Sequence, residues 1–256
     1  MLPIASLSRD EARRLEGLLF DLDDTLLDHG RLTETAYSAL FRLREAGLAL
    51  YVVTGRPSPW VRLLTRIAPI SGGVAENGAV AWTADGRLID AAEGEQRELR
   101  RSRTLDLVDA VRRAFPDLEP ADDAHERLTD FTFDIGERKR VSAERVERVA
   151  AFVRDRGGNV HTSSVHLHVS FDAADKASGV IALLSATRSL DPTAARTRYA
   201  FIGDSENDAA CFAAFPLSIG VANLRGRPTL TPRFKTSLPR GQGFAEAARV
   251  LAAFRS

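Results

Sequence analysis

Apolar runs alternate with amphipathic segments in two separate parts of the chain. In the first part, residues 18–20 and 48–53 are apolar runs of strand length, and residues 33–47 between them have the apolar spacing of a helix. In the second part, a helical pattern begins at Lys176 and is followed by the apolar run at residues 199–203, a further helix and a further strand. Apolar strands that alternate with helices are typical of a parallel sheet covered on both faces. The pattern therefore predicts an α/β core to which both parts contribute.

The stretch between these two parts has a different pattern. It contains a hairpin at residues 78–90, a helix rich in Arg and Leu at about residues 98–115 and a second helix at about residues 142–156. It also contains two strands in which polar and apolar residues alternate, at residues 128–135 and 165–171. Half-buried strands together with helices are typical of an α+β unit. We therefore predict an α+β insert at residues 85–171 and a core formed by residues 1–84 and 172–256.

Carboxylates follow two of the predicted core strands. Asp21 and Asp23 come directly after the first apolar run, and the period of two in an extended chain directs both to the same side. Asp204 and Asp208 follow the run at residues 199–203. The carboxyl ends of parallel strands meet at one edge of the sheet, where such folds bind ligands. Four carboxylates at one edge need a cation, and oxygen ligands without His or Cys indicate a hard ion such as Mg²⁺.

A third strand end carries Thr54, Gly55 and Arg56. Gly55 leaves the neighbouring backbone amides accessible to a phosphate group. Any one of the strand-end Asp residues could instead be a turn former or a helix cap. The occurrence of several such signals, each directly after a predicted strand, favours a site at this edge.

These segments resemble the four motifs of the haloacid dehalogenase superfamily of phosphohydrolases, which match DLDDTLL, VTGR, Lys176 and GDSENDAA here. The insert lies between the second and third motifs, as in the subgroup with a class II (IIB, Cof-like) cap. The segment VAENGA at residues 74–79 is similar to that subgroup's sugar-phosphate phosphatases. The resemblance implies a Rossmann-like parallel-sheet core with an inserted α+β cap. It also implies Mg²⁺-dependent hydrolysis of a small phosphorylated metabolite, with a sugar phosphate as the expected substrate.

The resemblance assigns catalytic roles to individual residues. It makes Asp21 the nucleophile that becomes an aspartyl phosphate. It makes Asp23 the group that protonates the leaving alcohol and then activates the hydrolytic water. Thr54, the Gly55 amide and Lys176 would hold the phosphoryl oxygens where charge lies in the transition state.

The resemblance also implies a set of metal ligands. Asp204 would bind Mg²⁺ directly, together with Asp21 and the backbone carbonyl of Asp23. Asp208 and Asn207 would act through metal-bound water or by orienting the ligands. We therefore expect Mg²⁺ as the cofactor.

Two side chains of the predicted insert are candidates for substrate recognition. His166 and His168 alternate with apolar residues in VHLHVSF, so an extended strand places both on one face. That face either meets solvent or covers the active site. A zinc site is disfavoured because no Cys partner accompanies the pair. Together with Arg56 and Asn77, these histidines are our candidates for substrate specificity.

The sequence does not define a role for two further residues, Asp24 and Cys211. Asp24 stands where members of the superfamily often have Gly, and it is either a turn residue or a determinant of substrate choice. Cys211 is the single cysteine and lies among Ala and Phe in a predicted helix, which is typical of a buried core residue. We assign no catalytic role to Cys211 and leave the role of Asp24 open.

Charge and composition limit the kinds of binding partner and the cellular compartment that we expect for this protein. The chain has 35 Lys and Arg and 35 Asp and Glu, so its zero formal charge gives no overall field to hold nucleic acid or an anionic membrane. No window approaches the roughly 18 apolar residues of a membrane helix. The N-terminal segment has neither the basic start nor the apolar run of a signal peptide. We therefore expect a cytoplasmic protein whose partner is a small-molecule phosphate ester, and no nucleic-acid or membrane partner.

Other functions are compatible with the same motifs. A phosphomutase of the superfamily would keep them and return the phosphoryl group to a sugar. A phospho-acceptor signalling domain also uses acidic residues at a sheet edge and a Lys, but a general acid/base at Asp23 favours turnover over a persistent phosphoryl mark. A non-catalytic metabolite-binding protein would not need the complete set of motif residues.

Overall fold

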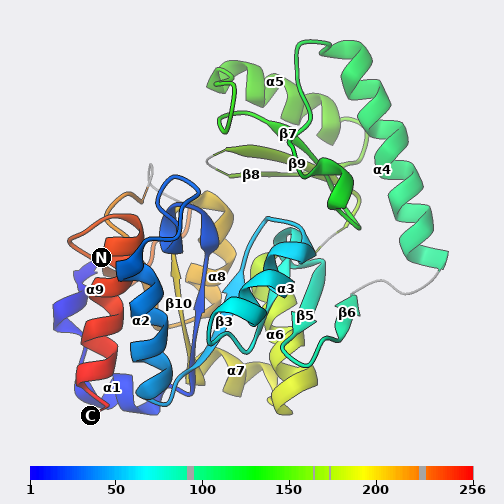
Figure 1. The fold of residues 1–256 in the computed structure, drawn as a ribbon. Coiled ribbons are helices and arrows are strands. Elements are labelled where there is room, and N and C mark those ends of the chain that lie inside the picture. Colours follow the sequence, from blue (N-terminus) through cyan, green and yellow to red (C-terminus); the bar gives the residue numbers. More distant parts are fainter. Residues whose placement is uncertain (91–94, 164, 173, 225–228, 256) are drawn as a thin grey trace.

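Nine strands in the described part of the chain form one sheet (Figure 1). The computed structural model describes residues 1–90, 95–163, 165–172, 174–224 and 229–255. The strand order is β1-β12-β11-β10-β2-β3-β4-β5-β6, and neighbours pair in parallel except β4 with β5 and β5 with β6. The strands span Leu2–Pro3 (β1), Gly17–Phe20 (β2), Ala49–Val53 (β3), Gly72–Ala75 (β4), Val80–Thr83 (β5), Leu88–Asp90 (β6), Tyr199–Gly203 (β10), Ser218–Gly220 (β11) and Phe234–Lys235 (β12). This sheet confirms the predicted α/β class.

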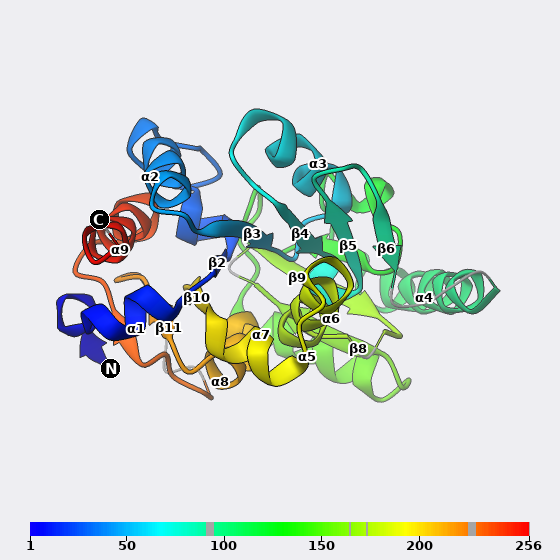
Figure 2. The same ribbon diagram turned by 90° about the horizontal axis from the view of Figure 1, so that it is seen from below.

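Helices cover both faces of the large sheet, and Figure 2 shows α2 and α9 on one side and α7 and α8 on the other. Leu18 and Phe20 of β2 belong to a hydrophobic cluster with α1, α2, α3 and α9, whereas Leu19 packs with α6, α7 and α8. Because all three side chains are buried, β2 shows no polar alternation in the sequence. The helices span Arg9–Arg14 (α1), Glu34–Glu45 (α2), Ser58–Ile67 (α3), Lys176–Arg188 (α6), Pro192–Arg198 (α7), Ala209–Ala214 (α8) and Arg240–Ala253 (α9).

A second sheet of three antiparallel strands, in the order β7-β9-β8, lies in a smaller unit that we call the cap (residues 95–170). Its elements span Glu95–Ala114 (α4), Phe131–Asp134 (β7), Ala143–Arg154 (α5), Asn159–Thr162 (β8) and His166–Ser170 (β9). The apolar face of this sheet, with Phe133, Leu167 and Val169, packs with α4 and α5 in a hydrophobic cluster of its own. Figure 1 shows the small sheet between α5 and the large sheet. The polar face of β7 and β9 is therefore turned toward the core.

The predicted start of the insert at residue 85 is wrong for one element. Strand β6 pairs with β5 in antiparallel register, with Ala81 opposite Ile89, and so belongs to the large sheet. The prediction places residues 85–90 in the insert because the pattern of the hairpin differs from that of a buried parallel strand. An edge hairpin can extend a parallel core sheet in antiparallel fashion, and the pattern of polar residues does not distinguish the two cases.

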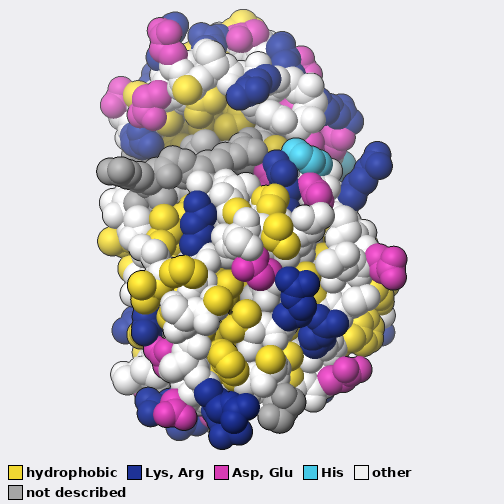
Figure 3. All heavy atoms as spheres, turned by 90° about the vertical axis from the view of Figure 1, so that its left-hand side faces the viewer, with side chains coloured by type: hydrophobic (Ala, Val, Ile, Leu, Met, Phe, Trp, Pro, Cys, Tyr) yellow, Lys and Arg dark blue, Asp and Glu magenta, His cyan; other side chains and the backbone are white. Residues whose placement is uncertain are grey.

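The surface of the molecule agrees with the balanced charge of the chain. On the face shown in Figure 3, Lys and Arg side chains are interspersed with Asp and Glu side chains. None of the helices in the described ranges combines the length and the hydropathy needed to cross a bilayer.

Candidate active site

The carboxyl ends of three neighbouring parallel strands bring predicted site residues together. Asp21 follows β2, Thr54 follows β3 and Asp204 follows β10, and β2 lies between the other two strands in the sheet. The backbone N–H of Asp21 donates to the carbonyl of Ile202, which continues the β2–β10 pairing up to the carboxylate. Asp21, Thr54 and Asp204 are all buried. The topology of the sheet thus places two carboxylates and a hydroxyl at one edge.

Lys176 reaches this edge from the first turn of α6. Asp175 caps the helix by accepting a hydrogen bond from the Ser178 N–H, which fixes the position at which Lys176 enters the site. The Lys176 Nζ atom donates to Asp21 Oδ1 at 2.6 Å and to Asp208 Oδ1 at 2.7 Å. Burial by itself would lower the pKa of Lys176, but Asp208 and Asp21 raise it above its usual range. Lys176 is therefore a fixed positive charge between two carboxylates.

Asp21, Asp204 and Asp208 form a compact carboxylate cluster. One oxygen from each lies within 4.8 Å of the others. Burial raises the pKa of Asp21 to about 7, and burial together with Asp21 and Asp208 raises the pKa of Asp204 well above its usual value. The three carboxylates therefore cannot all be ionised beside one lysine unless a further cation balances their charge. Closely spaced carboxylate oxygens without nitrogen or sulfur donors suit a hard divalent cation such as Mg²⁺.

The other two residues of the fourth motif have partners within their own turn, η5 (Glu206–Asp208). Asp208 Oδ2 accepts hydrogen bonds from the backbone N–H groups of Asp204 and Ser205, and its Oδ1 accepts from Lys176. Asn207 Oδ1 accepts a hydrogen bond from Ser205 Oγ. Asp208 thereby orients both Lys176 and the Asp204 backbone.

Asp23 bonds to Arg56 and does not join the carboxylate cluster. Arg56 donates from Nε to Asp23 Oδ2 at 2.9 Å and from Nη2 to Oδ1 at 2.9 Å. The same Nη2 lies 3.2 Å from Oε1 of Glu137, which belongs to the cap. Burial would lower the pKa of Arg56, but Asp23 and Glu137 raise it. A metal contact by Asp23 would therefore use the backbone carbonyl, as the resemblance implies.

Asp24 occupies a backbone conformation that Gly adopts without strain. Its φ is +55°, in the left-handed region that Gly, Asn and Asp adopt most readily. Its side chain pairs with Arg240 at 3.1 Å, and Asp24 is not part of the carboxylate cluster. These contacts fit a turn residue anchored to α9.

The two cap histidines face the core residues across a small cavity. Both are only 2% exposed, so the solvent-facing alternative for these side chains is wrong. The cavity lies between core and cap and is lined by Asp21, Asp23, Gly55, Arg56, Ser163, His166, His168, Asp204, Ser205 and Asn207. Its volume of about 10 Å³ is close to the minimum that one water molecule needs. A phosphate ester can enter only if the cap or the lining side chains move.

Each histidine is held by a carboxylate of the cap. His166 Nε2 lies 2.8 Å from Glu137 Oε2, and His168 Nδ1 lies 2.8 Å from Asp130 Oδ2. Hydrogen bonding to His166 and the charge of Arg56 lower the pKa of Glu137 to about 2 despite partial burial. Arg127 and His168 also lower the pKa of Asp130 despite its burial, so both carboxylates are anionic at neutral pH.

Several residues that join cap and core were missed by the sequence analysis. Glu76, in the 3₁₀ turn η3 (Glu76–Gly78), accepts hydrogen bonds from the backbone N–H groups of Leu128 and Thr129 at 3.0 and 2.7 Å. Arg127 donates to the carbonyl of Gly55 at 3.0 Å. The only available signal for Glu76 was its place beside Asn77 in VAENGA. Its partners lie more than 50 positions away, and no local pattern indicates them.

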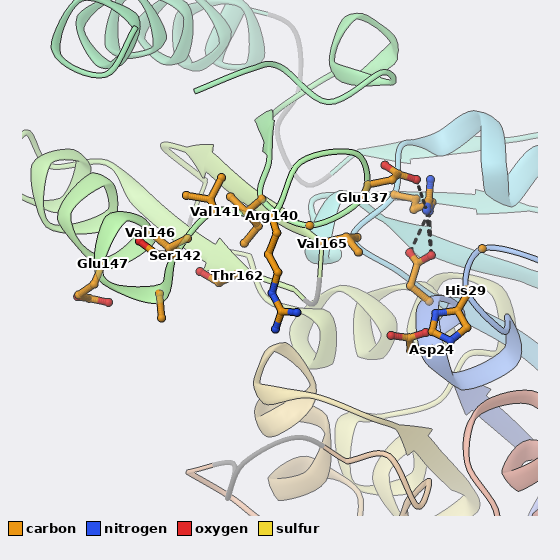
Figure 4. Close-up of a pocket in the computed structure, with 16 residues that line it drawn as sticks. Asp24, His29, Glu137, Arg140, Val141, Ser142, Val146, Glu147, Thr162 and Val165 are labelled. Carbon is orange, nitrogen blue, oxygen red and sulfur yellow. Dashed lines mark hydrogen bonds and ion pairs between the residues drawn. The ribbon is translucent and has the colours of Figure 1, made fainter. Parts of the chain in front are cut away.

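A larger groove borders the small cavity at Asp23 and Arg56, which line both. Its volume is about 1140 Å³. Figure 4 shows Asp24 and His29 on the core side and Arg140, Val146 and Thr162 on the cap side. The groove provides a route by which a leaving group could extend away from Asp23.

Comparisons with known proteins agree with the fold and the motifs. The family model described as haloacid dehalogenase-like hydrolase matches residues 18–113. A protein named phosphoglycolate phosphatase from Metallosphaera sedula is 28% identical to this chain, over 90% of this chain and 95% of its own length. A protein of the same name from Methanothermobacter thermautotrophicus is 26% identical, over 92% of this chain and 98% of its own length. A crystal structure from Thermoplasma acidophilum has a TM-score of 0.75 at 20% identity, covering 93% of this chain and 98% of that chain.

The family-model match and the curated relatives confirm the resemblance to the haloacid dehalogenase superfamily of hydrolases that its four motifs indicate. The curated relatives are named phosphatases, and the matching family is one of hydrolases.

Proposed function

We propose that this chain is a Mg²⁺-dependent phosphomonoester hydrolase that acts on a small phosphorylated metabolite, a sugar phosphate, through an aspartyl-phosphate intermediate. The contact of Asp21 Oδ1 with Lys176 Nζ at 2.6 Å, at the edge shared with Asp204, carries the proposal. This contact orients a carboxylate nucleophile and places a positive charge where a phosphoryl group would sit.

In the first step, an Asp21 carboxylate oxygen attacks phosphorus and the bond from phosphorus to the leaving oxygen breaks. Asp23 gives its proton to that oxygen, so an alcohol leaves. In the second step, Asp23 takes a proton from a water molecule that attacks the phosphorus of the aspartyl phosphate. The bond from phosphorus to Asp21 breaks, and inorganic phosphate leaves. Thr54, the Gly55 amide and Lys176 bind the phosphoryl oxygens in both steps.

Asp21, the Asp23 carbonyl and Asp204 are the residues that would hold Mg²⁺, with Asp208 and Asn207 orienting this set. When bound, the ion would supply positive charge against the phosphoryl group and the carboxylate cluster. The charge imbalance of Asp21, Asp204 and Asp208 against one lysine supports this assignment.

A second substrate is favoured by one observation. The relatives with 28% and 26% identity carry the name phosphoglycolate phosphatase. Phosphoglycolate is also a small ester, but its leaving group bears a carboxylate where a sugar bears hydroxyls. A phosphomutase activity remains the alternative reaction, because transfer to a second sugar would use the same motif residues.

Release of inorganic phosphate from a panel of esters, with and without Mg²⁺, tests the proposal. The panel should contain hexose and triose phosphates, phosphoglycolate and p-nitrophenyl phosphate, and each sugar reaction should be examined for an isomeric sugar phosphate as the mutase product. Asp21→Asn removes the nucleophile with almost no change in volume, so we expect it to abolish turnover while the circular dichroism spectrum stays unchanged. Turnover by Asp21→Asn at the wild-type rate would contradict the mechanism.

A further inference from the structure

Three buried polar atoms of two side chains lack a hydrogen-bond partner, and two of them, Asn77 Oδ1 and His168 Nε2, lie beside Gly55. The third is Nδ2 of Asn77. The point at which a Cβ atom of Gly55 would lie is 3.0 Å from Asn77 Oδ1 and 3.2 Å from His168 Nε2. His168 is 2% exposed and Asn77 is 4% exposed, so solvent at the surface does not satisfy these atoms. Buried polar atoms are nearly always paired, which makes this group a candidate ligand contact.

The two side chains come from different parts of the molecule. Asn77 belongs to the turn η3 of the core, where its φ of +54° fixes the direction of its side chain. His168 lies in the middle of β9 in the cap. Their meeting depends on contacts that seat the cap on the core, among them those of Glu76 with Thr129 and of Arg127 with the Gly55 carbonyl. A site made of Asn77 and His168 is therefore complete only when the cap is closed.

The position of the proton on His168 follows from its partner. Asp130 is held ionised, because Arg127 and His168 lower its pKa despite its burial. An ionised carboxylate can only accept a hydrogen bond, so the Nδ1 atom at 2.8 Å carries the hydrogen. Burial lowers the pKa of His168 to about 4, so the ring is neutral near pH 7 and Nε2 presents a lone pair.

An acceptor nitrogen beside a primary amide is complementary to a hydroxyl group. A hydroxyl can donate to His168 Nε2 and, once the Asn77 amide is turned so that Nδ2 takes the place of Oδ1 beside Gly55, accept from that amide at the same time. A phosphoryl oxygen or an ionised carboxylate has no proton to donate to Nε2. His168 and Gly55 line the same cavity as Asp21 and Asp23, so the hydroxyl would belong to the leaving group near the ester bond.

We propose that Asn77 and His168 form a hydroxyl-binding subsite shared by core and cap, which selects phosphate esters whose leaving group carries a hydroxyl near the ester oxygen. This inference rests on the proposed phosphatase function and defines its substrate class. His166 is not part of the subsite, because its Nε2 is bonded to Glu137.

The test uses three esters that differ at this position. Glycerol 3-phosphate carries hydroxyls, propyl phosphate has the same chain length without them, and phosphoglycolate carries a carboxylate. The measured quantity is the ratio of kcat/KM for glycerol 3-phosphate to that for each of the other two esters. This ratio does not depend on the fraction of enzyme that is folded and active.

Four variants separate the subsite from general damage. His168→Asn keeps a donor near Nδ1 for Asp130 and removes Nε2, whereas His168→Gln keeps a polar group near Nε2. Asn77→Gly removes the amide at a backbone conformation that Gly adopts without strain. His125→Asn, at an exposed histidine of the cap, is the matched control.

We expect the wild-type enzyme to prefer glycerol 3-phosphate to propyl phosphate by about tenfold, the usual effect of leaving site groups unpaired. His168→Asn and Asn77→Gly should each lower this ratio about tenfold, His168→Gln by less, and His125→Asn not at all. Equal losses for all three esters, or a wild-type enzyme that hydrolyses propyl phosphate as well as glycerol 3-phosphate, would overturn the subsite and leave the phosphatase function standing. Absence of hydrolysis of all three esters by the wild-type enzyme would contradict the proposed function and the subsite with it.

Discussion

Arg56 and Asp23 form a two-point ion pair, with Nε 2.9 Å from Oδ2 and Nη2 2.9 Å from Oδ1. Such paired hydrogen bonds hold a carboxylate in one orientation. The same guanidinium contacts Glu137 of the cap, which in turn bonds to His166. The proposed acid/base residue is thus linked through one arginine to the element that closes the site.

Removal of Arg56 should therefore affect the rate more than substrate binding. We expect Arg56→Ala to lower kcat about tenfold or more, because a charge-assisted pair is lost and Asp23 is left without its orienting partner. Arg56→Lys keeps the charge but not the two-point geometry and should lower kcat by less. Steady-state kinetics with the best ester checks this, with Arg62→Ala on α3 as the control because Arg62 packs over Trp82 away from the cavity. An unchanged kcat in Arg56→Ala would show that the ion pair does not position Asp23.

The core part of the site could be predicted from sequence because the parallel sheet itself brings residues at the ends of neighbouring strands together. A buried strand followed by an acidic residue is a local pattern, and parallel pairing brings the ends of β2, β3 and β10 to one edge. This pattern predicts Asp21 and Asp204, and the Thr-Gly-Arg sequence after the next strand predicts Thr54. Lys176 has no comparable local signal, and only the resemblance to a known family indicated its place.

The contacts between cap and core could not be predicted in the same way. The alternation in β9 placed His166 and His168 on one face, but it did not show whether that face meets solvent or the core. The partners of Glu76 and Arg127 depend on how the cap is oriented over the large sheet. That orientation is set by contacts between residues far apart in the chain, for which a single sequence carries no periodic signal.

The carboxylate cluster predicts a strict requirement for a hard cation. Treatment with a chelator should abolish phosphate release, and addition of Mg²⁺ should restore it. Asp204→Ala removes one proposed ligand and should raise the Mg²⁺ concentration needed for half-maximal activity by about tenfold or prevent recovery. Asp106→Ala, at an acidic residue on α4 outside the cluster, is the control. Full recovery with Zn²⁺ alone would contradict the assignment of a hard ion.

Glu76 should contribute both to stability and to cap closure. It is 3% exposed and accepts hydrogen bonds from the Leu128 and Thr129 N–H groups, so Glu76→Ala should cost about 1–3 kcal/mol of unfolding free energy by leaving buried donors unpaired. It should also lower kcat/KM, because the closed position of the cap is weakened.

Glu246 provides a matched control for this variant. It also accepts backbone hydrogen bonds, from Ser237 and Leu238, but it lies on α9 away from the cap. Glu246→Ala should therefore reduce stability without the loss of kcat/KM. If both variants lowered kcat/KM equally, the effect of Glu76 would be one of stability alone. Urea denaturation and steady-state kinetics on the two proteins distinguish these cases.

The Glu137 carboxylate should make the stability of the protein depend on pH in the acid range. Its pKa is lowered from 4.5 to about 2 in the folded protein, first by the hydrogen bond to His166 and then by Arg56. The unfolded chain therefore binds a proton at this residue at higher pH than the folded protein does. The stabilisation is fully present above about pH 4.5 and is lost as the pH falls toward 2. Because Glu137 is 37% exposed, solvent screens part of this effect.

In Glu137→Gln, we expect the fall in Tm between pH 5 and pH 3 to be smaller than in the wild type by roughly 1–3 °C. Glu147→Gln, at an exposed ion pair with Arg154 on the same cap, should show the wild-type fall. Differential scanning calorimetry across this range checks the prediction, and identical pH dependence in Glu137→Gln and the wild type would show that Glu137 does not hold the cap to Arg56 and His166.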